Sequence, residues 1–161
     1  MEDNRGEVTL KLKYPVVVEE ITIDHISKAI IPDGFEKSAP KKIKVIGFPP
    51  CNEDDTECLS LGFDETDPMD IADFTFELDG PSVQSFHSHY GRAMKELEAT
   101  QASVETEESD DPASCSSEAA SCTTPPRISV AGVHVRVLEN WGNKKYTCLY
   151  RVRIHGEADD Y

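Results

Sequence analysis

Strict alternation of apolar and polar residues is the feature that most constrains this chain. In EVTLKLKY (residues 7–14) the apolar residues are Val8, Leu10 and Leu12, and the same alternation returns in VAGVHVRV (residues 130–137). A period of two places every second side chain on one side of an extended strand, so one face can be buried while the other is solvated. The chain is therefore expected to consist of strands packed over a common core.

Further segments have the β-branched and aromatic composition that favours strands. They are VVVEEITID (16–24), KIKVIGF (42–48), CLSLGFDE with DIADFTFELDG (58–65 and 70–80), VQSFHSH (83–89) and KKYTCLYRVRIHG (144–156). Pro15 is expected to interrupt the first strand, and Pro32, Gly34 and Pro40 mark turns. Several short strands, closely spaced turns and no long amphipathic helix predict an all-β fold, a β-sandwich.

A long insertion of different composition divides the strands. From residue 92 to 126 the chain is rich in Ser, Thr, Glu and Asp and has no aromatic residue. Such a segment cannot bury enough apolar area to offset its chain entropy, so we expect a disordered surface insertion between two strands. MKELEAT (94–100) could begin a short helix, although it shows no apolar stripe.

Charge and hydropathy exclude several classes of protein. The 161 residues suffice for about one domain, and their net charge of −15 argues against binding to nucleic acid or anionic lipid. No apolar run is long enough to span a bilayer, and MEDNRGEVTL (1–10) is not a secretory signal. As written, the chain therefore has no route into an oxidising compartment.

The five cysteines leave two interpretations open. Cys51 with Cys58, and Cys115 with Cys122, are near enough in sequence to form local disulfides, which leaves Cys148 as the odd residue. Free thiols are the other interpretation.

Catalytic and metal-binding signals are weak. His87 and His89 are two residues apart and could share a strand face, but no third ligand follows at a zinc-site spacing. The acidic stretches PCNEDDTE (50–57) and DETDPMD (64–70) do not follow the order of a calcium-binding loop. We expect no enzyme activity, no metal and no cofactor, and an enzyme with a metal on His87 and His89 is the weakest hypothesis.

The last predicted strand carries polar residues on an otherwise apolar face. Alternation places Tyr146, Cys148 and Tyr150 on one side, together with Val152 and Ile154. A sandwich core whose tyrosine hydroxyls reach the rim is one explanation, and a binding face is the other.

The sequence also resembles a known family. DHISKAIIPDGFEKSAPKKIKVIGF (24–48), FTFELDG (74–80), VQSF (83–86) and VRVLENWGNKKYTCLYRVRIHGE (135–157) are similar to the C-terminal two thirds of a SUN domain. The resemblance implies a jelly-roll-like β-sandwich over residues 6–157, with residues 92–126 inserted into it. It further implies a module of the inner nuclear membrane that faces the perinuclear space, forms trimers below a coiled coil and binds KASH-protein tails. That complex, the LINC complex, tethers the nuclear envelope to the cytoskeleton.

The resemblance also implies a site. His25, Ser38, Tyr146 and Tyr150 match the family's pocket for the terminal residues and carboxylate of the KASH tail. Cys148 matches a cysteine that pairs with one earlier in the domain. The family's coiled coil, membrane anchor, lid hairpin and partner cysteine have no counterpart in this sequence, so we expect Cys148 to lack its usual partner.

A jelly-roll glycan-binding module is the alternative function. It would use exposed aromatic residues such as Trp141 or Tyr90 as a platform for a sugar ring.

Overall fold

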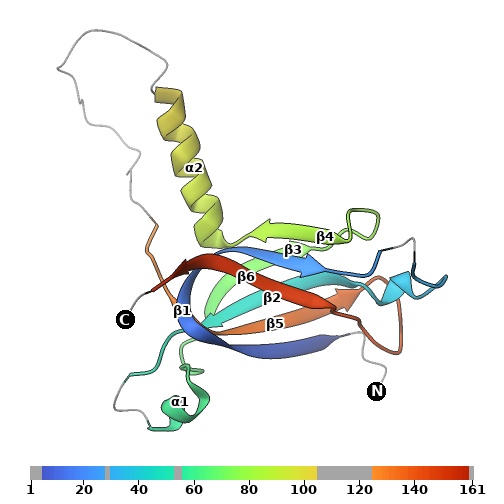
Figure 1. Ribbon diagram of the computed structural model, residues 1–161, viewed down its shortest axis with the longest axis horizontal. Coiled ribbons are helices and arrows are strands. Elements are labelled where there is room, and N and C mark those ends of the chain that lie inside the picture. The colour runs from blue at the N-terminus through green and yellow to red at the C-terminus, as the bar shows by residue number, and fades with distance from the viewer. Residues whose placement is uncertain (1–4, 28–29, 53–55, 105–124, 160–161) are drawn as a thin grey trace.

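The computed structural model describes residues 5–27, 30–52, 56–104 and 125–159 (Figure 1). In chain order the elements are β1 (Gly6–Asp24), the 3-10 turn η1 (Glu36–Ser38), β2 (Pro40–Phe48), α1 (Thr56–Leu61), β3 (Met69–Thr75), β4 (Val83–His87), α2 (His89–Val104), β5 (Val130–Asn140) and β6 (Arg151–Ala158).

All strand pairs are antiparallel, and the long strand β1 takes part in three of them. Its first half pairs with β5, while its second half pairs with both β4 and β6, and the order across the sheet is β3-β2-β5-β1-β4 with β6 on β1. The sheet curls so far that its two outer strands, β3 and β4, come into contact. At that contact Phe74 of β3 stacks on Phe86 of β4, with ring centroids 4.0 Å apart. The predicted all-β sandwich is confirmed.

The core lies inside this curl and follows the alternation read from the sequence. The fully buried side chains with at most 1% exposure include Ile21 and Ile23 of β1, Ile43 and Val45 of β2, and Val133 and Val135 of β5. Side chains from β4 and β6, such as Phe86 and Ile154, pack against this cluster from the other layer.

Pro15 interrupts the regular pairing of the first strand, as the sequence predicts. β1 continues through it, and the pairing register with β5 shifts between Lys11 and Val16. An irregularity of this kind accommodates a proline, because the ring removes a backbone donor that a regular ladder would use.

Two predicted strands are shorter or absent. Residues 56–61 form helix α1 rather than part of a strand, and a disulfide between Cys51 and Cys58 ties its first turns to the end of β2. Residues 144–150 are irregular, and β6 begins only at Arg151. The prediction that Tyr146, Cys148 and Tyr150 share a strand face is therefore wrong.

The predicted disordered insertion begins with a helix. Helix α2 covers residues 89–104, so the prediction of disorder from residue 92 is wrong up to residue 104, and residues 105–124 lie outside the described part of the chain. The helix starts at a capping serine, since the Ser88 hydroxyl donates to the Val18 carbonyl and accepts from the Gly91 amide. Tyr90, Met94 and Leu97 are half-buried at helical spacing, a stripe that the sequence analysis missed. Figure 1 shows α2 projecting from the strands.

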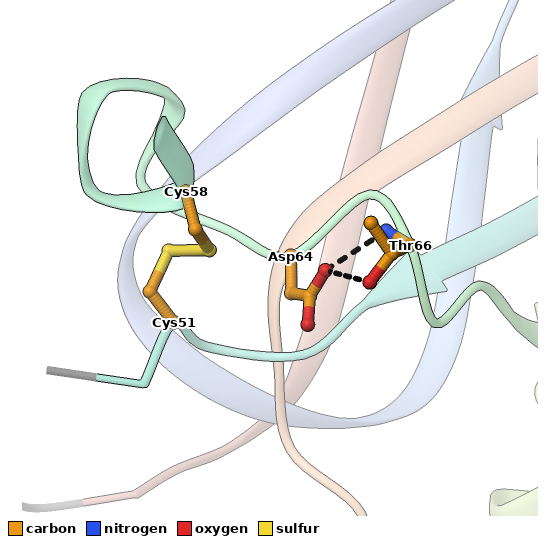
Figure 2. The surroundings of a disulfide bond; sticks show 4 residues. All are labelled: Cys51, Cys58, Asp64 and Thr66. Carbon is orange, nitrogen blue, oxygen red and sulfur yellow. Dashed lines mark hydrogen bonds between the residues drawn. A yellow bond between two sulfur atoms is a disulfide. The ribbon is translucent and has the colours of Figure 1, made fainter. Parts of the chain in front are cut away.

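One of the two possible local disulfides is present (Figure 2). Cys51 and Cys58 are joined, with their Cα atoms 5.6 Å apart, whereas Cys115 and Cys122 lie outside the described residues. Beside the bridge, the Asp64 carboxylate accepts hydrogen bonds of 2.8 Å from the Thr66 amide and 2.6 Å from its hydroxyl. These two bonds lower the pKa of Asp64.

Candidate functional site

The segment between β5 and β6 is shaped by one buried side chain, Asn140. Its Nδ2 donates to the Asn143 carbonyl at 2.7 Å, the Thr147 hydroxyl at 3.0 Å and the Tyr146 carbonyl at 3.2 Å. Its Oδ1 accepts from the Gly142 amide at 2.9 Å. These bonds satisfy the backbone locally, so the segment forms a fixed loop instead of extending β6.

The turn η1 docks on this loop through backbone hydrogen bonds. The Cys148 amide donates to the Ser38 carbonyl at 2.8 Å, and the Asn143 amide donates to the Lys37 carbonyl at 3.1 Å. The Trp141 amide adds a bond of 3.2 Å to the Ala39 carbonyl. Ser38 and Cys148 therefore become neighbours although they are far apart in sequence.

His25 follows directly after β1 and lies among aromatic rings. Its ring meets Tyr150 edge-on at a centroid distance of 5.5 Å and Phe76 at 6.1 Å. Both ring nitrogens are buried and have no hydrogen-bond partner among the described residues. Burial lowers the pKa of His25 below its usual value of 6.5, so the ring is neutral at pH 7.

A cavity of about 260 Å³ opens beside this ring. Its lining is mixed: Ile26, Ile31, Phe76, Leu78 and Pro81 are apolar, and the polar residues at the wall are His25, Ser27, Glu36 and Ser82. A buried imidazole without a partner on the wall of a cavity is a group that can bind a polar ligand atom.

The structure brings the four predicted site residues to one end of the molecule as two pairs. His25 contacts Tyr150 directly, as described above. Ser38 and Tyr146 are connected through Phe35, because the Ser38 hydroxyl donates to the Phe35 carbonyl at 2.6 Å and the Phe35 and Tyr146 rings are 6.5 Å apart. Tyr150 and Tyr146 are 59% and 37% exposed and can meet a ligand, whereas Ser38 is only 2% exposed.

Sequence reasoning missed two residues that shape this site. Asn140 builds the loop that carries both tyrosines, and Phe35 lies between Ser38 and Tyr146. An asparagine directly before a Trp-Gly turn was the available signal for Asn140, because such side chains commonly bond to nearby backbone. Phe35 gave no signal, since its contacts depend on how η1 docks.

The other candidate residues have different surroundings. The Trp141 ring nitrogen donates to the Phe76 carbonyl at 3.0 Å and the Lys41 ammonium lies 4.7 Å from the ring centroid, so Trp141 is a packing residue. His87 and His89 have separate acidic neighbours, Glu20 and Asp73, each at 3.8 Å. Within the described ranges no three His, Cys, Asp or Glu side chains are grouped as metal ligands.

Comparison with known proteins identifies the family. The Sad1/UNC-like C-terminal family model matches residues 1–100 and 93–158, which together include nearly the whole chain. The chain belongs to this family, and it is a SUN-domain module.

Curated relatives are similar at low identity over almost the full chain. Human SUN domain-containing protein 1 is 29% identical over 154 residues, 96% of this chain and 14% of the relative. Mouse SUN domain-containing protein 3 is 28% identical over 158 residues, 98% of this chain and 35% of the relative. The nuclear migration and anchoring protein unc-84 of Caenorhabditis elegans is 24% identical over 156 residues, 97% of this chain and 10% of the relative. The chain thus spans about a third or less of these relatives.

None of the helices in the described part of the chain combines the length and the apolar character that a bilayer span requires.

Proposed function

We propose that this chain is a binding module, without catalytic activity, that captures the C-terminal tail of a KASH protein and so helps to tether the nuclear envelope to the cytoskeleton. The observation that carries the proposal is His25, whose two buried ring nitrogens have no hydrogen-bond partner among the residues that the structure describes and lie beside the exposed Tyr150, in a chain of the SUN family. The ring nitrogens of His25 are the atoms to which a bound ligand would hydrogen-bond.

The chemistry of the site suits a terminal carboxylate. Tyrosine hydroxyls and a neutral imidazole N–H are donors, and hydrogen bonds to an ionised oxygen are about twice as strong as neutral ones. Ser38 already uses its single proton on the Phe35 carbonyl. Its hydroxyl must therefore turn toward the ligand before it can donate to a carboxylate, which couples tail binding to the conformation of η1.

Local positive charge offsets the acidic character of the whole chain. A net charge of −15 repels an anionic ligand at long range, but Lys37 lies in the last turn of η1 and Lys41 lies over the Trp141 ring. At physiological salt the Debye length of about 8 Å screens exposed charges that lie farther than this from the ligand. The Glu36 carboxylate lines the cavity itself, so the lysines also have to offset this local negative charge.

The Cys51–Cys58 disulfide supports an oxidising compartment, in line with a domain that faces the perinuclear space. The relatives' names also support this location, because unc-84 is named for nuclear migration and anchoring. A position at the inner nuclear membrane and trimer formation in a longer form of the protein belong to the same proposal.

The deciding experiment compares a KASH-tail peptide with a free carboxylate and the same peptide with a C-terminal amide by calorimetry. We expect the amide to bind far more weakly, since a lost hydrogen bond to a charged group costs on the order of 1–3 kcal/mol, roughly 5- to 150-fold in affinity. Equal binding of the two peptides would contradict the pocket assignment.

Tyr150→Phe and Ser38→Ala test the pocket from the protein side. Each removes one hydroxyl, and we expect each to weaken binding of the free acid on the order of 1–3 kcal/mol. Tyr14→Phe is the matched control, because Tyr14 is 56% exposed on the first half of β1 and belongs to no part of the site. Full affinity in both site variants would argue against these roles.

A further inference from the structure

Within the described part of the chain, the first half of β1 has one side without a paired strand. Val16 pairs with Val130 of β5 and also with Ala158 of β6, so these two strands lie on opposite sides of β1. β6 ends there, and the last bond on its side runs from the Asp159 amide to the Pro15 carbonyl. From residue 6 to 14, no strand in the described part of the chain pairs with the side of β1 that faces away from β5. Figure 1 shows this half of β1 as the outermost strand of its layer.

The unpaired edge also carries apolar side chains that are incompletely covered. Val8 and Tyr14 are 37% and 56% exposed, and Leu10 and Leu12 between them are only half-buried. An edge strand of nine residues with uncovered apolar side chains is a template for pairing with another strand.

We propose that a second copy of this chain binds this edge, with the two β1 strands antiparallel about a two-fold axis at Leu10. The inference is independent of the peptide-binding function. It rests on the self-complementary sequence of residues 6–14, GEVTLKLKY.

The charges decide the register of the pair. With Leu10 opposite its own copy, Glu7 faces Lys13 twice, Val8 faces Leu12 and Thr9 faces Lys11. Apolar residues then meet apolar residues on one face, and opposite charges meet on the other, which is the favourable arrangement for directly opposed positions.

Neighbouring registers are worse. A pair centred on Lys11 would oppose Lys11 to its own copy, a like-charge contact that destabilises a sheet. A pair centred between two residues would place apolar side chains opposite polar ones along the whole edge. A pair centred on Thr9 would leave Lys13 and Tyr14 outside the nine-residue overlap.

The groups that would form the charged pairs are held only loosely within one chain. The Glu7 carboxylate is 3.6 Å from His134 and 3.7 Å from Arg136, both longer than a normal hydrogen bond. The Lys13 ammonium lies 4.9 Å from the centroid of the neighbouring Tyr14 ring. Both side chains can turn to a partner strand at little cost.

Charge reversal in the full 161-residue chain tests the proposal, with sedimentation equilibrium from micromolar to millimolar concentration as the readout. The unmodified chain is expected to form a dimer. Glu7→Lys and Lys13→Glu each create two like-charge contacts, so each should weaken dimerisation about tenfold or more. The double variant Glu7→Lys/Lys13→Glu restores opposite charges and should recover the dimer.

Recovery of the dimer in the double variant would distinguish strand pairing between two chains from effects of the substitutions within one chain. Residues 7 and 13 lie six positions apart along one strand, too far to contact each other in the same chain. Lys95→Glu, on helix α2 away from this edge, is the control variant and should leave the dimer unchanged. A chain that stays monomeric at all concentrations, or a double variant that is no better than the single ones, would overturn the proposal.

Hydrogen exchange gives a second, independent readout. Amides of residues 6–14 that point away from β5 should exchange more slowly as the protein concentration rises, because pairing supplies acceptors to them. If protection at this edge does not depend on concentration, the two-fold strand pair does not form.

Discussion

His25 has a proposed role in binding, and its burial also makes the stability of the fold depend on pH. Its pKa lies below the usual 6.5 because burial disfavours the charged ring, so the unfolded chain binds a proton more readily than the folded one. The stability that comes from the neutral ring is therefore complete above about pH 6.5 and is lost as the pH falls below it. Two acidic groups lie close to this ring in the fold: Glu36 lines the same cavity, and Asp24, the residue before His25, is bound by Arg153.

We predict that the free energy of unfolding in urea decreases between about pH 7.5 and about pH 5.5, and that His25→Phe makes this decrease smaller. Phenylalanine fills the space between Phe76 and Tyr150 without a titratable group. An equally steep pH dependence in His25→Phe would show that other groups cause it.

Asn140 is the residue whose loss should most disturb the binding loop. Asn140→Ala removes the donor to the Asn143 and Tyr146 carbonyls and to the Thr147 hydroxyl, all part-buried hydrogen bonds, so we predict a loss of about 2–3 kcal/mol in the free energy of unfolding. Urea titration measures it. Asn52→Ala, at an exposed position, is the control and should cost almost nothing. A comparable loss in both variants would count against the role of Asn140.

At the scale of the elements, the Cys51–Cys58 disulfide stabilises the connection between β2 and α1. It closes a short loop, which is worth about 2.5 kcal/mol by restricting the unfolded chain. The stacking of Phe48 on Phe63, with centroids 5.3 Å apart, fixes the far side of the same connection against the sheet.

We predict that the double variant Cys51→Ser/Cys58→Ser loses about 2.5 kcal/mol of unfolding free energy and that reductant changes its stability less than that of the unmodified chain. The control is Cys148→Ser, which removes a free thiol and should retain the response to reductant. If the unmodified chain has the same stability with and without reductant, the bridge contributes nothing to folding.

At the scale of the whole molecule, β5 and α2 differ in how completely the rest of the protein covers them. β5 lies between β2 and β1 and contributes several valines with at most 3% exposure, whereas α2 projects from the strands, and its side chains are partly covered up to Leu97 and exposed at residues 98–100.

Native-state hydrogen exchange should reflect this difference. We predict that amides of β5 exchange most slowly, near the rate set by global unfolding, and that amides in the second half of α2 exchange orders of magnitude faster. Mass spectrometry of peptic fragments distinguishes the two segments. Equal protection of both would mean that α2 is held by contacts beyond those described.

The predictions from sequence succeeded where a single local pattern sufficed. The alternation in residues 7–14 and 130–137 predicted strands, and both segments are strands, with the apolar positions of β5 buried in the core and those of residues 7–14 in β1 only partly covered. Prediction from the alternation failed at residues 144–150. There the side chains of Asn140 and Asn143 hydrogen-bond to the loop backbone, and these bonds stabilise a loop although the sequence alternates like a strand. The prediction of disorder also failed at α2. A low content of apolar residues indicates that a segment contributes little to the core, but it does not prevent a helix that is capped by Ser88.

The sequence by itself determined most of the strand segments, the all-β class and the family, because these depend on residue order and local spacing. Only the tertiary structure decided that His25 meets Tyr150, that Ser38 lies beside Cys148 and that Gly6 to Tyr14 form an open edge. The physical reason is the curl of the sheet and the docking of η1 on the loop after β5. Both depend on contacts between residues far apart in the chain, and no local pattern encodes them.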